Sequence, residues 1–380
     1  MRRRSLACLA LLLVALVAQA AHAGRPRYAD PTALGPYGVG HVVFDVTDPA
    51  RGDRALRAEL WYPVDPADAI GDPTWYDFQF FGLGLASPVA IEGAPLTADT
   101  WLPLILFSHG NCGVSFQSTP LMEQLASHGM VVVAPNHTGN TVNECISGSE
   151  DPFAVSAQDR PADLSFLIDH FLAKSFDPTD DFFAHINPFA IGVAGHSFGG
   201  YTAIAMASGI EAPEYGISVA PDPRVRAIAP IAPASEFFSD AELASIDVPT
   251  FLLGATLDDT VPVIPNLSRP FDLIPSRPLY RAELIGAGHL HFANACAIGQ
   301  ALLDFGVSLP QVGNLVPGYD DTCGPDDFPI EEAERLTAFY VTAFFKRHLL
   351  HDTRYDAFLG EDYAAENEPL VHYLRKDPGE

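Results

Sequence analysis

The chain has 380 residues, of which 48% are hydrophobic and 18% are charged, with 21 Lys and Arg against 48 Asp and Glu. This composition supports a sizeable hydrophobic core and excludes a chain that is disordered overall. A net charge of −27 repels phosphate backbones and anionic lipid headgroups, which argues against nucleic-acid binding and against electrostatic docking on membranes.

The first 23 residues are typical of a secretory signal peptide. Three arginines at positions 2–4 precede an apolar run over residues 6–17, and residues 21–23 form an Ala-x-Ala cleavage site. The apolar run is shorter than the ~20 residues of a membrane span, and no later segment is long and apolar enough for one. We therefore expect a signal peptide over residues 1–23, cleaved after Ala23 or Ala20, and an exported protein that is secreted or periplasmic.

The start of the mature chain predicts strands followed by a long insertion. Strands are expected over residues 42–46 and 57–62. Residues 63–100 are rich in Gly, Pro and aromatics without a clean period. This stretch is expected to be a long ordered insertion, and its aromatics between Trp75 and Phe81 either line a pocket or pack as core.

From residue 103 onward, buried strands alternate with helices. Continuous apolar runs predict strands, and apolar spacing near 3.6 predicts helices. The predicted strands are 103–108, 130–135, 191–195, 225–231, 251–254 and 280–285. The predicted helices are 119–128, 158–174, 198–208 and 331–350. This alternation is typical of an α/β protein with a mostly parallel central sheet and helices on both faces, and we expect one domain over residues 24–380.

The most informative motif is Gly195-His196-Ser197-Phe198-Gly199, which matches G-x-S-x-G. It falls where a predicted strand ends and a predicted helix begins. A sharp strand-to-helix turn is the context in which this motif holds a serine nucleophile in a strained backbone conformation. Ser197 is therefore the predicted nucleophile rather than a helix N-cap.

A serine hydroxyl needs a base, and the base needs a group that orients it. The loop after the strand at 251–254 carries Asp258 and Asp259, and a glycine-rich turn after the strand at 280–285 carries His289. We predict Asp258 as the acid and His289 as the base. Asp259 and His291 are the alternatives, and His196 is interpreted as structural.

An oxyanion formed from an ester carbonyl needs two backbone N–H donors. One is predicted to belong to Phe198, the residue after the nucleophile. The other is predicted to be the N–H of Asn111, which follows His109 and Gly110 directly after the strand at 103–108.

Cysteine usage agrees with export. Cys8 lies within the signal, so Cys112, Cys145, Cys296 and Cys323 remain in the mature chain. An even number of cysteines in an oxidising compartment suggests two disulfides, for which three pairings are possible. We favour the pairs of chain neighbours, Cys112–Cys145 and Cys296–Cys323. No CxxC pair or His-x-x-x-His helix indicates a zinc site.

Ser197, Asp258 and His289, in that chain order, resemble the α/β-hydrolase superfamily over essentially the whole mature chain. The sequence further resembles secreted bacterial proteins grouped with platelet-activating-factor acetylhydrolases and dienelactone-hydrolase-like proteins, and it is similar to cutinase-like polyester hydrolases. The matching stretches are residues 58–63, 107–110, 195–200 and 286–289, and residues 258–263 for the cutinases. True dienelactone hydrolases use a cysteine nucleophile, whereas this chain has Ser197.

The resemblance implies ester hydrolysis without a metal or organic cofactor. We predict an exported serine hydrolase that cleaves carboxylic esters through an acyl-enzyme, with short-acyl esters or short-chain phospholipids as substrates. Polyester hydrolysis is the alternative within that class. A cofactor-free lyase or perhydrolase is an alternative from another class of protein function and would use the same residues. A binding protein with an inactive site is a further alternative, and the intact Ser–Asp–His set argues against it. The sequence leaves the particular ester and the oligomeric state open.

Overall fold

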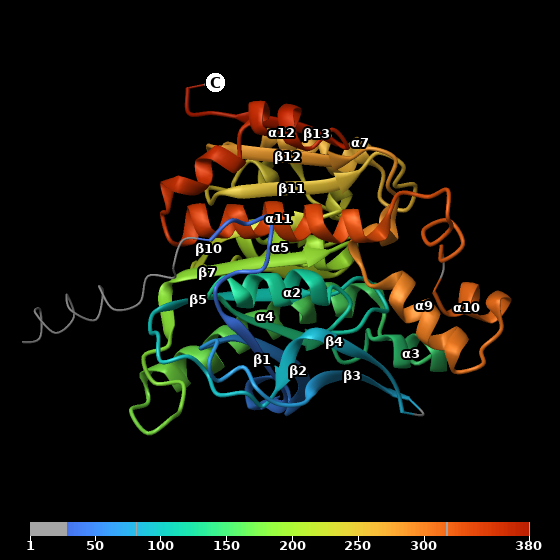
Figure 1. Cartoon of the computed structure of the whole chain (residues 1–380). Coiled ribbons are helices and arrows are strands. Elements are labelled where there is room, and N and C mark those ends of the chain that lie inside the picture. The colour runs from blue at the N-terminus through green and yellow to red at the C-terminus, as the bar shows by residue number, and fades with distance from the viewer. Residues whose placement is uncertain (1–28, 81, 317, 380) are drawn as a thin grey trace, which may run out of the picture.

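The computed structural model describes residues 29–379 apart from residues 81 and 317, so the predicted signal peptide lies outside the described residues (Figure 1). The first strands are β1 (Gly38–Asp48), β2 (Arg54–Val64), β3 (Pro73–Phe80), β4 (Leu83–Glu92), β5 (Leu102–Ser108), β6 (Val131–Asn136) and β7 (Ile186–His196). They are followed by β8 (Ile210–Ala212), β9 (Ile217–Val219), β10 (Val225–Ile231), β11 (Thr250–Ala255), β12 (Leu279–Leu284) and β13 (Val371–Lys376).

The helices of the first two thirds of the chain are α2 (Thr119–Ser127), α3 (Val142–Ser147), α4 (Phe153–Phe176), α5 (Phe198–Ser208), α6 (Asp240–Leu243), α7 (Val263–Asn266) and α8 (Ser268–Leu273). The remaining ones are α9 (Ala295–Asp304), α10 (Leu309–Leu315), α11 (Ile330–Leu349) and α12 (Glu361–Asn367).

The central sheet has eleven strands in the order β13-β12-β11-β10-β7-β5-β6-β2-β1-β4-β3. The six strands from β12 to β6 run parallel to one another. The strand pairs β12–β13, β6–β2, β2–β1 and β4–β3 are antiparallel. A parallel core with antiparallel strands at its edges is the mostly parallel α/β sheet that the sequence predicts, and it is that of the α/β-hydrolase fold.

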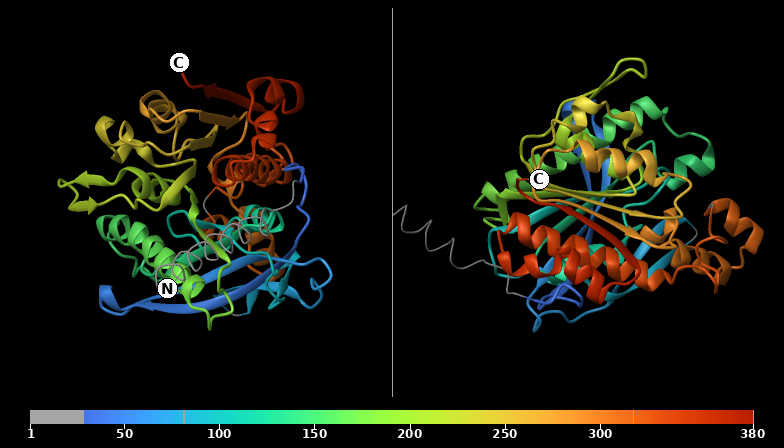
Figure 2. Two further views of the ribbon diagram at one scale, coloured as in Figure 1. Left: turned by 90° about the vertical axis from the view of Figure 1, so that its left-hand side faces the viewer. Right: turned by 90° about the horizontal axis from the view of Figure 1, so that it is seen from above.

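Each face of the sheet is covered by its own hydrophobic core. In β5, Ile105 and Phe107 belong to the cluster under α2 and α11, whereas Leu104 and Leu106 belong to the cluster under α4 and α5. Figure 2 shows α11 and α4 on opposite sides of the sheet. Because both faces are buried, β5 reads as a continuous apolar run instead of an alternating one.

The strands and helices predicted from the sequence are present, with ends that differ by a few residues. The long ordered insertion expected over residues 63–100 contains the hairpin of β3 and β4, two strands that the sequence did not predict. Two register irregularities interrupt its pairing, and β4 pairs in parallel with β1. The irregular register explains why residues 73–92 lack the strict alternation that marks a strand.

Helices α9 and α10 pack on this hairpin, at the edge of the central sheet. Leu302 of α9 and Val312 of α10 form a small separate cluster with Leu83 of β4. Figure 1 shows α3, α9 and α10 at the same end of the sheet. That end is where the parallel strands terminate at their carboxyl ends, which is the usual position of a site in an open α/β sheet.

Candidate active site

Ser197 lies at the sharp turn between β7 and α5. Its backbone has φ 59° and ψ −117°, a region with positive φ that residues other than glycine rarely adopt. The N–H of Ser197 donates to the carbonyl oxygen of Ile231 at 2.8 Å, and its own carbonyl oxygen accepts from the N–H of Tyr201 at 3.1 Å. Strand β10 and helix α5 thus hold a strained residue in place, as a turn that presents a nucleophile requires.

Gly195 and Gly199 flank Ser197 because this turn leaves no room for side chains. A Cβ on Gly199 would lie 1.8 Å from the backbone oxygen of Ser108, and one on Gly195 would lie 2.3 Å from the backbone oxygen of Gly199. Both distances are far shorter than a van der Waals contact. The glycines therefore let α5 approach the end of β5, which brings Ser197 next to the loop that follows β5.

Asp258 and His289 meet from the loops after β11 and β12. Nδ1 of His289 lies 2.7 Å from Oδ2 of Asp258, and Oδ1 of Asp258 accepts the backbone N–H of Val261 at 2.7 Å. Asp258 is buried, whereas Asp259 is exposed. These contacts favour the tautomer of His289 that carries its proton on Nδ1, which leaves Nε2 able to accept a proton.

Ser197 and His289 line one cavity of about 680 Å³. Among the described residues, the side chain of His289 bonds to Asp258 and makes no hydrogen bond with Ser197. Contacts between a nucleophile and its base are often long until a substrate is bound. The fold therefore brings Ser197 and the Asp258-bonded ring of His289 to one shared cavity.

A second cavity of about 520 Å³ adjoins the first at Ser197 and Asn111, which line both. The larger cavity is mostly apolar, with walls from Phe78, Val114, Val142, Ile146, Leu290, Ile298 and Val316. The smaller one combines aromatic and acidic side chains, namely Phe153, Phe198, Phe237, Glu150 and Asp151. The serine thus lies between two spaces that differ in polarity.

The carbonyl oxygen of Gly110 is held by two donors within the protein. It accepts hydrogen bonds from Nη2 of Arg160 at 2.9 Å and from the N–H of Gly113 at 3.1 Å. Because N–H and C=O point in opposite directions across a trans peptide, the N–H of Asn111 points away from Arg160. The N–H of Phe198 belongs to the first turn of α5, where no partner exists within the helix.

His196, Gln117 and Gly110 form a chain of hydrogen bonds beneath Ser197. Gln117 accepts the N–H of Gly110 at 2.9 Å and donates through Nε2 to Nδ1 of His196 at 3.1 Å. Nε2 of His196 then donates to the carbonyl oxygen of His289 at 3.0 Å. Burial lowers the pKa of His196 well below its usual range, and the nearby His289 lowers it further. A neutral His196 therefore joins the turn of the serine to the residue predicted as its base.

His291, the alternative base, is held elsewhere. Its Nδ1 accepts the N–H of Gly288 at 3.0 Å, and its Nε2 lies 3.2 Å from the carbonyl oxygen of Phe328. The side chain is buried at 1% exposure. Both ring nitrogens have backbone partners, so the geometry favours His289.

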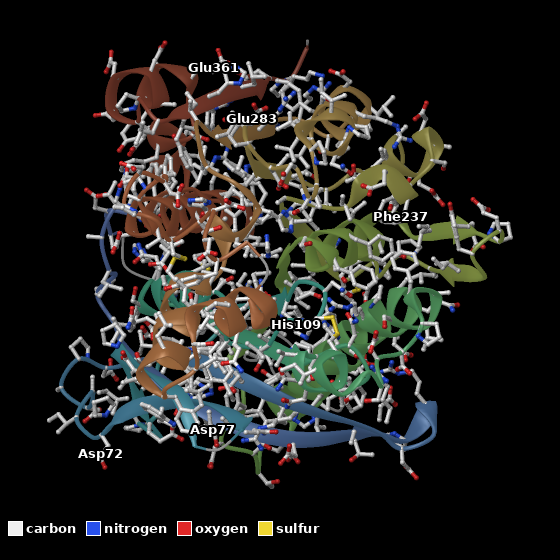
Figure 3. All side chains as sticks on the ribbon, turned by 90° about the vertical axis from the view of Figure 1, so that its right-hand side faces the viewer. Asp72, Asp77, His109, Phe237, Glu283 and Glu361 are labelled. Carbon is white, nitrogen blue, oxygen red and sulfur yellow. A yellow bond between two sulfur atoms is a disulfide. The ribbon has the colours of Figure 1, made fainter. Side chains whose placement is uncertain are left out.

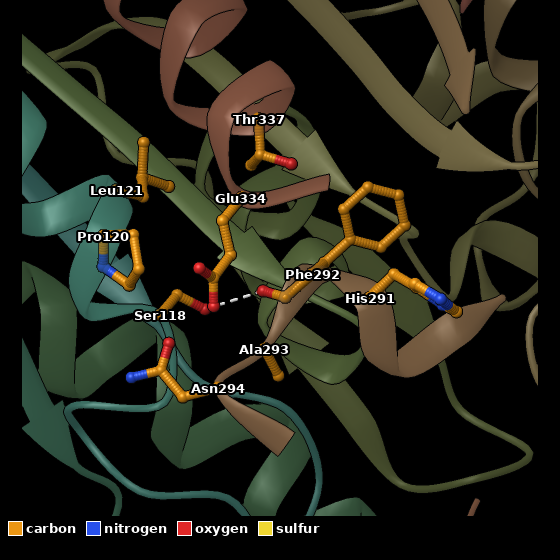
Figure 4. A pocket seen from close by; sticks show the side chains of 9 residues that line it. All are labelled: Ser118, Pro120, Leu121, His291, Phe292, Ala293, Asn294, Glu334 and Thr337. Atoms are coloured by element: carbon orange, nitrogen blue, oxygen red, sulfur yellow. Dashed lines mark hydrogen bonds between the residues drawn. The ribbon is translucent and has the colours of Figure 1, made fainter. Parts of the chain in front are cut away.

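The chain after His289 is anchored to α2. Figure 4 shows Oγ of Ser118 donating to the carbonyl oxygen of Phe292 at 2.8 Å, with Glu334 of α11 close by. Nδ2 of Asn294 donates to Oγ1 of Thr119 at 2.6 Å. These bonds between distant segments fix the loop that carries His289.

The structure joins Cys112 to Cys145 and Cys296 to Cys323, the pairs of chain neighbours that we favoured. The first bond ties the loop after β5 to α3, and both of its cysteines line the larger cavity. Figure 3 draws disulfides as yellow bonds and labels His109, which lies three residues before Cys112 in the loop after β5. The second bond closes the segment that holds α9 and α10, which also contributes to the wall of that cavity.

Sequence reasoning did not identify Gln117 or Arg160 as part of the site. Neither lies in a recognisable motif. Arg160 reaches Gly110 from α4, 50 residues further along the chain, and Gln117 meets His196 across 79 residues. Among the described residues, no group of three or more His, Cys, Asp and Glu side chains is arranged to hold a metal ion. No helix in that part of the chain has the length and apolar character of a membrane span.

The sequence is similar to one protein family over part of its length and to individual cutinases over a longer stretch. Residues 85–226 match the chlorophyllase family. Over 255 residues, or 67% of this chain, the sequence is 24% identical to cutinase 1 and 25% identical to cutinase 2 of Thermobifida cellulosilytica, in each case covering 71% of the relative. It is 24% identical to a cutinase of Thermobifida fusca (strain YX), of which it covers 62%.

Proposed function

We propose that this chain, an ester hydrolase of the cutinase-like type with an α/β-hydrolase fold, cleaves carboxylic esters with Ser197 as nucleophile, His289 as base and Asp258 as the acid that orients it. The observation that carries this proposal is the strained turn of Ser197, which shares a cavity with a His289 ring bonded at 2.7 Å to Asp258. Likeness to cutinases supports the same chemistry.

The proposed reaction has two halves. Nε2 of His289 takes the proton of the Ser197 hydroxyl while Oγ bonds to the ester carbonyl carbon, and Asp258 stabilises the imidazolium. The N–H groups of Asn111 and Phe198 donate to the oxyanion of the tetrahedral intermediate. His289 then protonates the leaving alcohol. Water, deprotonated by the same ring, attacks the acyl-enzyme, and the acid is released as Ser197 regains its proton.

The two cavities favour a neutral ester with an apolar group on at least one side of the carbonyl. An apolar chain fits the larger cavity, because its lining is mostly aliphatic. An anionic group close to Glu150 and Asp151 in the smaller cavity would meet like charges. We therefore propose neutral short-acyl esters as substrates, followed by zwitterionic short-chain phospholipids. The cutinase relatives make a polyester the second candidate.

We further propose that the mature protein is a single exported domain. The predicted signal over residues 1–23 supports this, as do the two disulfides, because such bonds persist in oxidising compartments.

The test is a series of p-nitrophenyl esters of increasing acyl length, measured beside a short-chain phosphatidylcholine and a suspended aliphatic polyester. We expect turnover of the neutral soluble esters by the wild-type protein and none by Ser197→Ala. The proposal fails if the purified protein hydrolyses none of these substrates, or if Ser197→Ala hydrolyses them equally well. Preference for the polyester over all soluble esters would favour the second candidate.

A further inference from the structure

Arg160 is a buried cation directly beneath the proposed oxyanion site. It projects from α4 and has 0% exposure. In the part of the chain that the structure describes, it makes no ion pair with a carboxylate and its hydrogen-bond partners are uncharged, although the nearby charge of Asp163 favours its charged form. Asp163, one turn further along the same helix, instead bonds to Arg54 and to His137. A buried and unpaired charge is costly, which makes its position informative.

The hydrogen bonds of Arg160 fix the peptides that lead to Asn111. Nη1 donates to the carbonyl oxygen of His109 at 2.5 Å, and Nη2 donates to that of Gly110 at 2.9 Å. Both carbonyls therefore face the guanidinium, and the N–H groups of Gly110 and Asn111 face the opposite way. The first of these N–H groups donates to Gln117, and the second is the proposed oxyanion donor.

The same guanidinium also contacts the second proposed donor residue. Its central carbon lies 4.4 Å from the centre of the Phe198 ring. Arg160 thus contacts the residues on both sides of the oxyanion site. The neighbouring imidazole of His109 adds no charge, because burial lowers its pKa well below the usual range and Arg160 lowers it further.

Asn140 connects this cation to the wall of the cavity. Its Oδ1 accepts from Nε and Nη2 of Arg160 at 3.0 and 2.5 Å, and its Nδ2 donates to Oδ1 of Asn111 at 3.0 Å. A neutral amide is thus the side chain that meets the guanidinium here. A carboxylate of the same shape would fit and would neutralise the charge.

Building on the proposed esterase function, we propose that Arg160 is a positioning residue for the oxyanion site. It orients the N–H of Asn111 by holding the carbonyls of His109 and Gly110, and its unpaired positive charge stabilises the negative charge that develops on the ester oxygen. This charge is preorganised, since the guanidinium is held by several hydrogen bonds before any substrate binds.

Asn140→Asp is the sharpest test, because it keeps the shape of the side chain and pairs Arg160 with a carboxylate. We expect kcat to fall about 10- to 100-fold, the order of magnitude for unit charges several ångströms apart at an effective dielectric constant near 20. KM should change by less than about threefold, since the oxyanion exists only in the transition state. An arylboronic acid, whose tetrahedral adduct with Ser197 mimics that state, should bind more weakly by the same factor as kcat. The melting temperature should stay equal or rise.

The matched control is Asn111→Ala, which removes the same hydrogen bond between Asn111 and Asn140 without adding charge and keeps the backbone N–H. It should lower kcat less than Asn140→Asp does. Arg160→Lys, a second variant that keeps the positive charge, should retain more activity than Arg160→Met if both fold. A kcat of Asn140→Asp within twofold of wild type, or an equal loss in Asn111→Ala, would overturn the inference. If Ser197→Ala is inactive in the same assay, such a result would reject only the role of Arg160 and leave the esterase proposal standing. An active Ser197→Ala would reject the esterase proposal and the role of Arg160 together.

Discussion

Nε2 of His196 donates a hydrogen bond to the carbonyl oxygen of His289 at 3.0 Å, so the residue before the proposed nucleophile holds the backbone of the proposed base. The centres of the two imidazole rings are 4.6 Å apart. Gln117 extends this connection to Gly110 in the loop after β5. The side chains of Gln117 and His196 thereby join three loops that follow separate strands.

Gln117→Leu should weaken both folding and catalysis, because it leaves Nδ1 of His196 and the N–H of Gly110 without partners in a buried place. An unsatisfied buried polar group costs ~1–3 kcal/mol. We expect a lower melting temperature and a lower kcat. Thermal unfolding and steady-state kinetics measure both, with the exposed Gln300→Leu as the control. A melting temperature and kcat of Gln117→Leu equal to those of the wild type would show that the hydrogen bonds of Gln117 contribute to neither stability nor catalysis.

Ser197→Ala should abolish turnover while the fold remains intact, because it removes the group that attacks the ester. Catalysis without the nucleophile retains at most ~10³–10⁴ over the reaction in water. Covalent labelling by a fluorophosphonate, followed by peptide mass spectrometry, identifies the reactive residue. A label on any other serine would contradict the assignment.

Asp258→Asn and Asp259→Asn should differ sharply in kcat. The amide at 258 would stabilise the wrong tautomer of His289, which lowers kcat by ~10⁴ in the serine protease triad. The change at 259 affects an exposed side chain and should leave kcat nearly unchanged. Kinetics of the two variants side by side, with circular dichroism as the check of folding, decides between them. A crippled Asp259→Asn would mean that the acid is the neighbouring residue.

Loss of the Cys112–Cys145 bond should reduce both stability and substrate binding. The bond joins two cysteines that are 33 residues apart in the chain. Removing such a bond lowers the free energy of unfolding by ~2–4 kcal/mol. Both cysteines line the larger cavity, so the double alanine variant should also show a higher KM. Non-reducing peptide mapping checks the pairing, and the double alanine variant of Cys296 and Cys323 is the control for general destabilisation. Free thiols in the purified protein would refute the prediction.

Glu334 should make the fold less stable as pH rises. Burial, together with the negative charges of Glu331 and Glu123, raises its pKa from 4.5 to about 7. Between these pH values the folded protein binds more protons than the unfolded chain, so the stabilisation present below pH 4.5 is lost as pH rises through about 7. Glu334→Gln should therefore melt higher than wild type at pH 8 and similarly at pH 4.5. The exposed Glu366→Gln should show no such difference between the two pH values.

The central strands could be predicted because burial on both faces requires a continuous apolar run, as over residues 103–108. The hairpin of β3 and β4 could not, since its conformation depends on contacts with distant segments. Gly84 is one example: a Cβ there would lie 2.4 Å from the backbone oxygen of Tyr76 and 2.5 Å from Nε1 of Trp75. A glycine inside a strand weakens the local signal, and the close approach of β3 explains why a glycine stands here.

The candidate site likewise has residues that the sequence could predict and residues that it could not. Ser197 and His289 follow predicted strands within short motifs, so sequence alone could assign them to one end of the sheet. Their catalytic roles stay predictions. Gln117 and Arg160 could not be found in this way, because their partners His196 and Gly110 are 79 and 50 residues away along the chain. Such residues become visible only when the topology brings those segments together.

The disulfide between Cys296 and Cys323 has a practical consequence for anyone purifying the protein. It spans the segment that holds α9 and α10, in which Phe305 is 55% exposed. A protease that cuts after Phe305 would leave two polypeptides that remain covalently joined. The cleaved material would run as one band on a gel without reductant and as two bands with it. Sample integrity is therefore judged only on reducing gels.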